Sequence, residues 1–131
     1  MYKIEITRFQ PHGTKQRLAV ADAAQAAAVI ANLDDGAAVI FVADIRDHID
    51  HGNFYVWWSA GQAYVRLDEH REHYARYRDT ATIRQGEAMF LDEDGASFSV
   101  LPADIVSVSS AKEALVHWLL TGRATDALIW S

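Results

Sequence analysis

Three features of this 131-residue sequence predict an α+β fold, in which a curved antiparallel sheet built from hairpins carries two helices mainly on one face. Two pairs of strand-like segments are each joined by a short link that contains glycine. Apolar residues recur at helical spacing in two other segments, one in the N-terminal half and one near the C-terminus. The length and the 50% hydrophobic content fit one domain over residues 1–131.

The N-terminal half predicts a strand, a helix and a second strand. Residues 2–9 alternate apolar with polar side chains, as in a strand with one buried face. Asp22 followed by Gln25 is typical of a helix start, and apolar residues recur at helical spacing after it at Ala26, Val29, Ile30 and Leu33. The continuous apolar run at 37–42 fits a strand that is covered on both faces.

The middle of the chain predicts two hairpins. Residues 53–59 and 63–67 flank the link Ala60-Gly61-Gln62, so they should pair as antiparallel neighbours. Residues 87–91 and 96–101 flank a turn in which Gly95 is free to adopt a positive φ. The stretch 68–85 between the hairpins is rich in charge and tyrosine without clear periodicity, and we expect a loop or a short helix there.

The C-terminal region predicts a helix and an anchored end. Ser110 and Glu113 have the spacing of a capping box, and one helix face carries Ala111, Ala114, Leu115, Trp118 and Leu119. Gly122 should end this helix as its C-cap. The apolar residues 128–130 would fray if free, so their bulk predicts attachment to the core or to a sheet edge. We assign structural roles to Trp118, Gly122 and Trp130.

Charge and composition narrow the classes of partner. With 18 acidic and 12 basic side chains the net charge is −6, which disfavours nucleic acid, because phosphate binding depends on clustered lysine and arginine. The acidity suits either a basic protein partner or simply solubility. The absence of cysteine excludes disulfides and fits a reducing compartment. With no apolar stretch near the roughly 20 residues that cross a bilayer, and no signal-peptide character at the start, we expect a cytoplasmic protein.

The motifs that carry a catalytic mechanism are missing. The sequence has no Gly-x-Ser-x-Gly elbow, no Walker loop and no dinucleotide fingerprint. A paired-carboxylate acid/base site stays open, because the spacing that matters there is spatial. We therefore expect a protein that is not an enzyme and that holds no cofactor.

Two His-x-x-His spacings supply the alternative function, a small metal-dependent enzyme. They are His48 with His51, and His70 with His73, each among acidic residues. On a helix, a three-residue offset puts both imidazoles on one face, where they could share a transition metal with a carboxylate. The competing interpretation is solvated loop histidines, since the first pair lies beside Gly52 and neither pair has the glutamate register of zinc proteases.

The 53–67 hairpin has a second face that is rich in aromatic residues. If Phe54, Val56 and Trp58 face the core, the opposite face carries Tyr55, Trp57, Tyr64 and Arg66. These residue types dominate the hot spots of protein interfaces. Three alternatives are open: this face binds a partner, it is covered by a helix or by the segment with Tyr74 and Tyr77, or the register is reversed and Trp58 points outward.

Acidic residues lie at the ends of the predicted strands. Loops at strand ends gather along one rim of a sheet, so these residues are either an acidic patch beside the aromatic face or ordinary solvated loops. A patch would suit a basic, nucleic-acid-handling enzyme as the partner. The candidate partner-binding residues are Asp44, Asp47, Asp50, Tyr55, Trp57, Tyr64, Arg66, Asp68 and Glu69.

The predicted helix at 111–120 leads into the step Thr121-Gly122, and Trp130 stands eight residues after that glycine. This pattern resembles the end of the first-numbered immunity family of bacterial polymorphic-toxin and contact-dependent inhibition systems, where a helix, a Thr-Gly step and a closing tryptophan have the same spacing. The strand order and the overall length are also similar. Thr125 stands where the family usually has a proline.

The resemblance implies a cytoplasmic antidote. Proteins of that family are encoded beside a toxin, often a nucleic-acid deaminase or nuclease delivered between competing bacteria, and they bind its toxic domain to block the active site. Such an inhibitor needs no catalytic group, metal or cofactor, and it implies a 1:1 complex with the cognate toxin domain. A third possibility is a ligand-binding or oligomeric accessory domain, which a large apolar pocket or self-association would mark.

Overall fold

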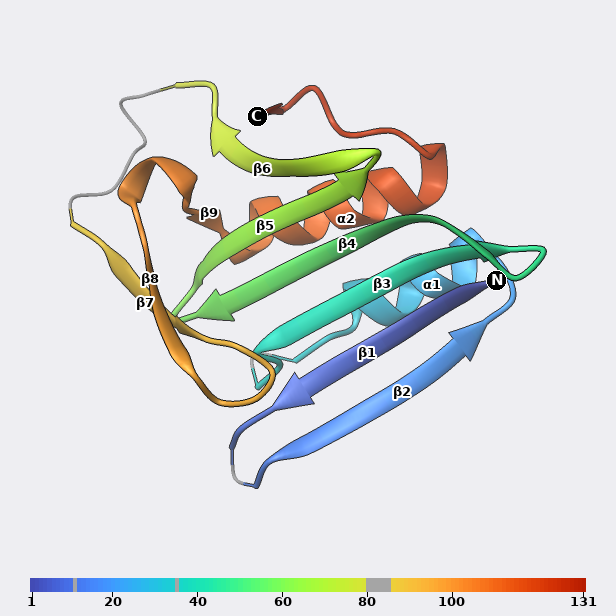
Figure 1. Cartoon of the computed structure of the whole chain (residues 1–131), viewed down its shortest axis with the longest axis horizontal. Helices are drawn as coiled ribbons and strands as arrows, with labels where there is room; N and C mark the ends of the chain where they lie inside the picture. Colours follow the sequence, from blue (N-terminus) through green and yellow to red (C-terminus); the bar gives the residue numbers. More distant parts are fainter. Residues whose placement is uncertain (11, 35, 80–85) are drawn as a thin grey trace.

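The computed structural model describes residues 1–10, 12–34, 36–79 and 86–131, and predictions that fall on Pro11, Asp35 and 80–85 lie outside the described residues. The predicted α+β class is confirmed. A large, open antiparallel sheet carries both helices on one face, and a separate small hairpin crosses one end of the other face (Figure 1). Neither of the two described α-helices is long and apolar enough to cross a membrane.

The main sheet contains eight strands: β1 (Tyr2–Arg8), β2 (Thr14–Val20), β3 (Val39–Arg46), β4 (Ile49–Ser59), β5 (Gln62–Glu69), β6 (Arg71–Tyr77), β9 (Val106–Ser107) and β10 (Leu128–Trp130). Their order is β10-β6-β5-β4-β3-β1-β2, and β9 pairs with the start of β5. The separate hairpin consists of β7 (Ala88–Leu91) and β8 (Ser97–Val100). The helices are α1 (Ala23–Ala31), α2 (Val108–Thr121) and the short 3-10 helix η2 (Pro102–Asp104).

The β4–β5 hairpin lies at the centre of the fold and has the first of the two predicted registers. Val56 is opposite Val65, and the two-residue turn is Ala60-Gly61, with φ of 51° and 79°. The side chains of β4 that face the helices are Phe54, Val56 and Trp58, and they belong to the main core with residues of α1 and α2. The reversed register, with Trp58 outward, is therefore wrong.

The opposite face of β4 is covered at one end by the β7–β8 hairpin. Phe90 and Val100 of that hairpin form a second buried cluster with Trp57 of β4 and Val39 of β3. We expected that, if this face was covered, a helix or the segment with Tyr74 and Tyr77 would cover it. A hairpin covers it instead, and it covers only the end near the β4–β5 turn.

Strands β2 and β6, and the two-residue strand β9, escaped the sequence prediction. Residues 71–77 form β6, not a loop or short helix, by pairing with β5 on one side and β10 on the other. Ala75 is the only buried residue of β6, and β2 has none, so neither strand shows the apolar alternation that marks a half-buried strand. Both depend on backbone pairing with neighbouring strands.

Helix α2 begins one turn earlier than the predicted capping box. Ser107 is the N-cap, and its Oγ accepts a hydrogen bond from the Ser110 backbone N–H at 3.0 Å. The helix start is held there because Val108 N–H donates to the Gly61 carbonyl at 3.0 Å. The box built on Ser110 and Glu113 is therefore wrong, whereas Gly122 does end the helix, with φ of 72°.

The C-terminus is attached to the sheet edge, as predicted. Tyr74 and Ser131 exchange two backbone hydrogen bonds, at 2.8 and 3.1 Å, beside the β10–β6 pairing. Trp130 Nε1 donates to the Thr125 carbonyl at 3.0 Å, and its ring lies 5.9 Å from that of Phe54. Trp130 therefore joins the terminus to the main core.

The position of the α2 cap is testable. Ser107→Ala removes the acceptor for the Ser110 N–H, so we expect the free energy of unfolding to fall by about 1 kcal/mol. Ser109→Ala, at an exposed position of the same turn, should change it by less than about 0.5 kcal/mol. Urea denaturation of the variants measures both values. A larger loss for Ser110→Ala than for Ser107→Ala would contradict this cap.

Candidate functional site

The sheet face opposite the helices carries a row of side chains that crosses six strands. The members are cross-strand neighbours in the order Arg17, Glu5, Phe41, Tyr55, Arg66 and Tyr74, and we call them the central row. Side chains directly opposite each other on antiparallel strands are close enough to touch. The rings of Phe41 and Tyr55 lie 4.8 Å apart, and the Arg66 guanidinium lies 4.8 Å from the Tyr55 ring centroid.

Arg66 is held in place by acidic neighbours. Its Nε and Nη2 donate to the two carboxylate oxygens of Asp68, both at 2.8 Å, and Nη2 lies 3.5 Å from Glu72. The hydrogen bonds with Asp68 raise the pKa of Arg66, so the guanidinium is a permanent, oriented cation. Because its Nε and Nη2 already contact carboxylates, Arg66 supplies mainly a flat contact area that packs on the Tyr55 ring.

Aromatic stacking links the central row to the next row of the face. Tyr55 stacks on Trp57 with centroids 5.4 Å apart, and Tyr64 stacks on Tyr74 at 5.3 Å. Burial raises the pKa of Tyr55, Tyr64 and Tyr74, so all three phenols stay neutral near pH 7. The face therefore offers broad rings with neutral hydroxyl groups, which is the chemistry of interface hot spots.

The β7–β8 hairpin decides which of these rings is accessible. Trp57 is only 8% exposed, and its Nε1 donates to Asp92 of the β7–β8 turn at 3.1 Å. Tyr64 is half-buried against Phe98, with centroids 6.0 Å apart. The prediction that Trp57 lies on an exposed contact surface is thus wrong in this structure, because a hairpin distant in sequence packs over it. The uncovered part of the face centres on Phe41, Tyr55 and Arg66.

A polar pocket of about 600 Å³ lies at the far end of the sheet, where the β3–β4 and β5–β6 turns meet. Its lining consists of Arg46, Asp50, His51, Gly52, Asn53, Asp68, Glu69 and His70. Three of the predicted acidic residues, Asp50, Asp68 and Glu69, are thereby brought together. Asp44 is 7% exposed and pairs with Arg46 at 2.7 Å, whereas Asp47 is exposed in the β3–β4 turn with φ of 52°.

The polar pocket is rich in hydrogen-bond acceptors. Glu69 is positioned by Trp118, whose Nε1 donates to it at 2.8 Å, and the Asn53 Oδ1 is buried without a partner among the described residues. Gly52, with φ of 153°, lets the chain approach the helix, since a Cβ there would lie 3.3 Å from Trp118. Carboxylates and an unused amide oxygen favour a ligand with several N–H donors, such as an arginine or lysine side chain.

The histidine pairs do not lie on helices, where a three-residue offset would put both imidazoles on one face. His48 and His70 lie in turns, with φ of 64° and 65°, whereas His51 and His73 lie in strands. The polar pocket instead brings together His51 and His70, one from each pair. In the part of the chain that the structure describes, no group of three or more histidine, aspartate or glutamate side chains is arranged to hold a metal ion.

Several residues of this surface escaped the sequence prediction, among them Phe41, Asn53, Glu72 and Tyr74. Phe41 lies in an apolar run that we interpreted as buried on both faces, yet it is half-exposed. Tyr74 and Glu72 lie in the unpredicted strand β6. The only usable signal in the sequence was the alternation of side chains along β4 and β5. That alternation does not identify which residues of the neighbouring strands β3 and β6 share the same face.

No protein-family model matches the sequence, and a search of curated proteins finds no significant relative.

The raised pKa of the half-buried Tyr64 predicts that the fold loses stability at alkaline pH. Burial, then the neighbouring Tyr74, raises the pKa of Tyr64 well above its ordinary value of 10.0. An unfolded tyrosine ionises near that value while folded Tyr64 stays protonated, so this contribution to stability is complete below pH 10 and is lost as the pH rises above it. We expect the free energy of unfolding to fall above about pH 10, and Tyr64→Phe to reduce that fall.

Urea denaturation at several pH values up to about 11 measures this effect. Tyr77→Phe is the control. Burial raises the pKa of Tyr77, but hydrogen bonds with Ser107 and Ser110 outweigh burial and the net direction is down. Removing Tyr77 should therefore not reduce the alkaline loss. Equal slopes for the wild type and Tyr64→Phe would show that Tyr64 ionises freely in the folded protein.

Proposed function

We propose that this protein is an immunity protein, which binds a cognate bacterial toxin domain and neutralises it by covering the active site. It acts in the cytoplasm by stoichiometric binding and catalyses no reaction. The partner is a basic, nucleic-acid-handling toxin domain, such as a deaminase or a nuclease. The spacing of Gly122 and Trp130, which resembles the first-numbered immunity family, supports this proposal.

The observation that carries the proposal is the central row on the sheet face that the helices leave uncovered. Phe41, Tyr55 and Arg66 are all half-buried and packed against one another, so we expect their side chains to be ordered before a partner arrives. Ordered side chains lose little conformational entropy on binding, which favours affinity. A rigid aromatic and arginine surface on a sheet is suited to a protein partner.

The polar pocket beside the central row supplies the charge complementarity. Asp50, Asp68 and Glu69 line it together with Asn53 Oδ1, which has no hydrogen-bond partner among the described residues. Of the described residues that line the pocket, only Arg46 carries a permanent positive charge. Enzymes that act on nucleic acid carry lysine and arginine where the phosphates bind. An acceptor-rich pocket can engage those same side chains, so a bound immunity protein would exclude the substrate by competing for them.

The size of the surface fits a 1:1 complex. Stable complexes of standard size bury about 800 Å² on each partner. The central row spans six strands, and adjacent strands lie about 4.8 Å apart, so this face is wide enough to supply such an area.

Neutralisation by the central row can be tested by co-expression. The toxin domain encoded by the neighbouring gene should stop bacterial growth, and this protein should restore growth and copurify with it at 1:1. Tyr55→Ala removes the ring at the centre of the row, so we expect the dissociation constant to rise about 30-fold. Tyr55→Phe keeps the ring and should retain most of the affinity. Isothermal titration calorimetry measures the three constants.

Leu120→Ala provides the matched control. Leu120 is 57% exposed on α2, on the side of the molecule away from the central row, so its loss should leave the affinity unchanged. Thermal unfolding of each variant separates a binding defect from misfolding. No restoration of growth by the wild-type protein would refute the proposed function. A Leu120→Ala defect equal to that of Tyr55→Ala would place the interface elsewhere.

The contribution of the polar pocket can be tested through salt dependence. Asp50→Asn removes one charge but keeps a side-chain oxygen, which can still accept the Gly52 N–H bond that Asp50 accepts at 2.9 Å. We expect the association rate constant to fall several-fold at low salt and its dependence on ionic strength to weaken, because long-range attraction decreases. Stopped-flow mixing at two salt concentrations measures this, and an unchanged salt dependence would place Asp50 outside the interface.

A further inference from the structure

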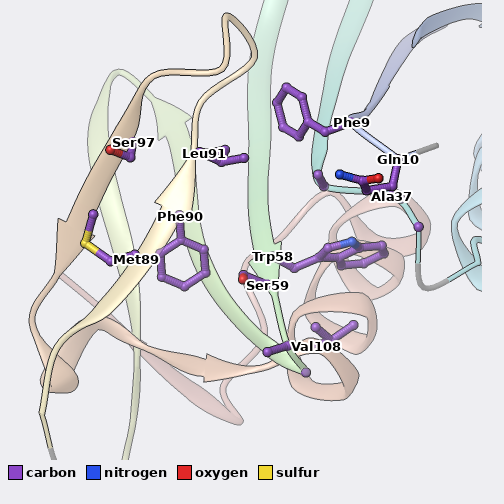
Figure 2. A pocket seen from close by; sticks show the side chains of 14 residues that line it. Phe9, Gln10, Ala37, Trp58, Ser59, Met89, Phe90, Leu91, Ser97 and Val108 are labelled. Carbon is purple, nitrogen blue, oxygen red and sulfur yellow. The ribbon is translucent and has the colours of Figure 1, made fainter. Parts of the chain in front are cut away.

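An apolar pocket lies at the opposite end of the sheet from the polar pocket. It has a volume of about 650 Å³ and lies between the β7–β8 hairpin and the ends of strands β1, β3 and β4 (Figure 2). Phe9, Trp58, Phe90, Leu91 and Val108 contribute its apolar walls. The volume falls within the range of about 300 to 1,000 Å³ that is typical of small-molecule sites.

The walls of this apolar pocket determine the charge of its ligand. None of the described residues that line it is charged, and their polar side chains are those of Gln10, Ser59 and Ser97. A charged ligand would lose its hydration there without gaining a counter-ion, which is strongly unfavourable. These walls therefore favour a neutral and largely apolar ligand. Leu91, which is 42% exposed, points from the hairpin toward Phe9 across the opening (Figure 2).

Trp58 supplies a directional feature, a buried donor. Its side chain lies in the pocket wall, the residue is 8% exposed, and its Nε1 is buried without a hydrogen-bond partner in the described part of the chain. The other three tryptophans all donate, Trp57 at 3.1 Å, Trp118 at 2.8 Å and Trp130 at 3.0 Å. Buried N–H groups normally have an acceptor, so this donor points to one that the ligand provides.

We propose that the apolar pocket binds a neutral small molecule whose carbonyl oxygen accepts a hydrogen bond from Trp58 Nε1. The nitrogen edge of the indole faces Gln10 and Ala37 in Figure 2, which places the acceptor between the hairpin and the β1 end of the sheet. This site is separate from the central row, because Trp58 lies on the helix side of β4 and Tyr55 on the other. It does not depend on the proposed toxin binding.

The test compares three ligands of similar size with different polarity. Acetophenone is neutral and has a carbonyl group, ethylbenzene lacks the acceptor, and benzoate is charged. In ¹⁵N-labelled protein, the four tryptophans give four indole N–H resonances, and Trp58→Phe assigns that of Trp58. We expect acetophenone to shift the Trp58 resonance downfield and to bind about three- to tenfold more tightly than ethylbenzene, with no binding of benzoate. In Trp58→Phe, acetophenone and ethylbenzene should bind equally.

Two further variants serve as controls, one for misfolding and one for a hydrogen-bond acceptor of Trp58 Nε1 within the protein itself. Leu91→Lys puts a charge in an exposed part of the wall, so it should abolish acetophenone binding while the free protein keeps its Trp58 resonance. Gln10→Ala should leave the resonance of the unliganded protein in place. If it moves instead, the Gln10 amide is the acceptor and the proposal is wrong.

The remaining outcomes also decide the proposal. Failure of acetophenone to shift Trp58, or equal affinities of acetophenone and ethylbenzene for the wild type, would refute the hydrogen bond to a carbonyl. A Trp58 resonance that moves with protein concentration alone would assign the pocket to a second copy of the chain. A resonance that moves only on addition of the toxin domain would assign it to that protein. Either result would overturn a small-molecule site.

Discussion

The alternation of side chains along strand β4 is the constraint on which the rest of the structure depends. Successive side chains of a strand point to opposite faces, so placing Phe54, Val56 and Trp58 against the helices puts Tyr55 and Trp57 on the other side. The core and the aromatic face are therefore coupled, and neither can be shifted by one residue without exchanging them. Pairing with β3 and β5 extends this order to Phe41 and Arg66, and so builds the central row.

Strand β4 also connects the polar pocket and the apolar pocket. Its 11 residues span roughly 30 Å, with the polar pocket at its first residues and the apolar pocket at its last. Each pocket depends on helix α2, because Trp118 orients Glu69 in the polar pocket and Val108 forms part of the wall of the apolar pocket. Packing of this helix on the sheet thus positions the groups that we assign to a basic partner and to a neutral ligand.

The β7–β8 hairpin divides the second face into a covered part and an open part. Phe90 and Phe98 pack on Tyr64, and Asp92 accepts the Trp57 indole hydrogen bond, so the covered part behaves as a second core. Tyr55, in the open part, continues this packing, because its ring stacks on the ring of the covered Trp57 with centroids 5.4 Å apart. The open part of the face is thus the uncovered edge of a packed cluster. We expect its side chains to lose little conformational entropy when a partner binds.

Local patterns in the sequence determined the class of fold, both hairpins, the position of both helices, and the separation of the two faces of β4, because alternation and turn chemistry act between near neighbours. They did not reveal β2 or β6, whose side chains carry little apolar signal, or the two-residue β9, and they located the α2 cap at Ser110 instead of Ser107. Only the tertiary structure decided that Trp57 is buried, that His51 and His70 share a pocket with Asp50, and that Trp58 Nε1 has no acceptor among the described residues. These facts depend on which segments, distant in sequence, pack against one another. The spacing of residues along the chain does not reveal those contacts.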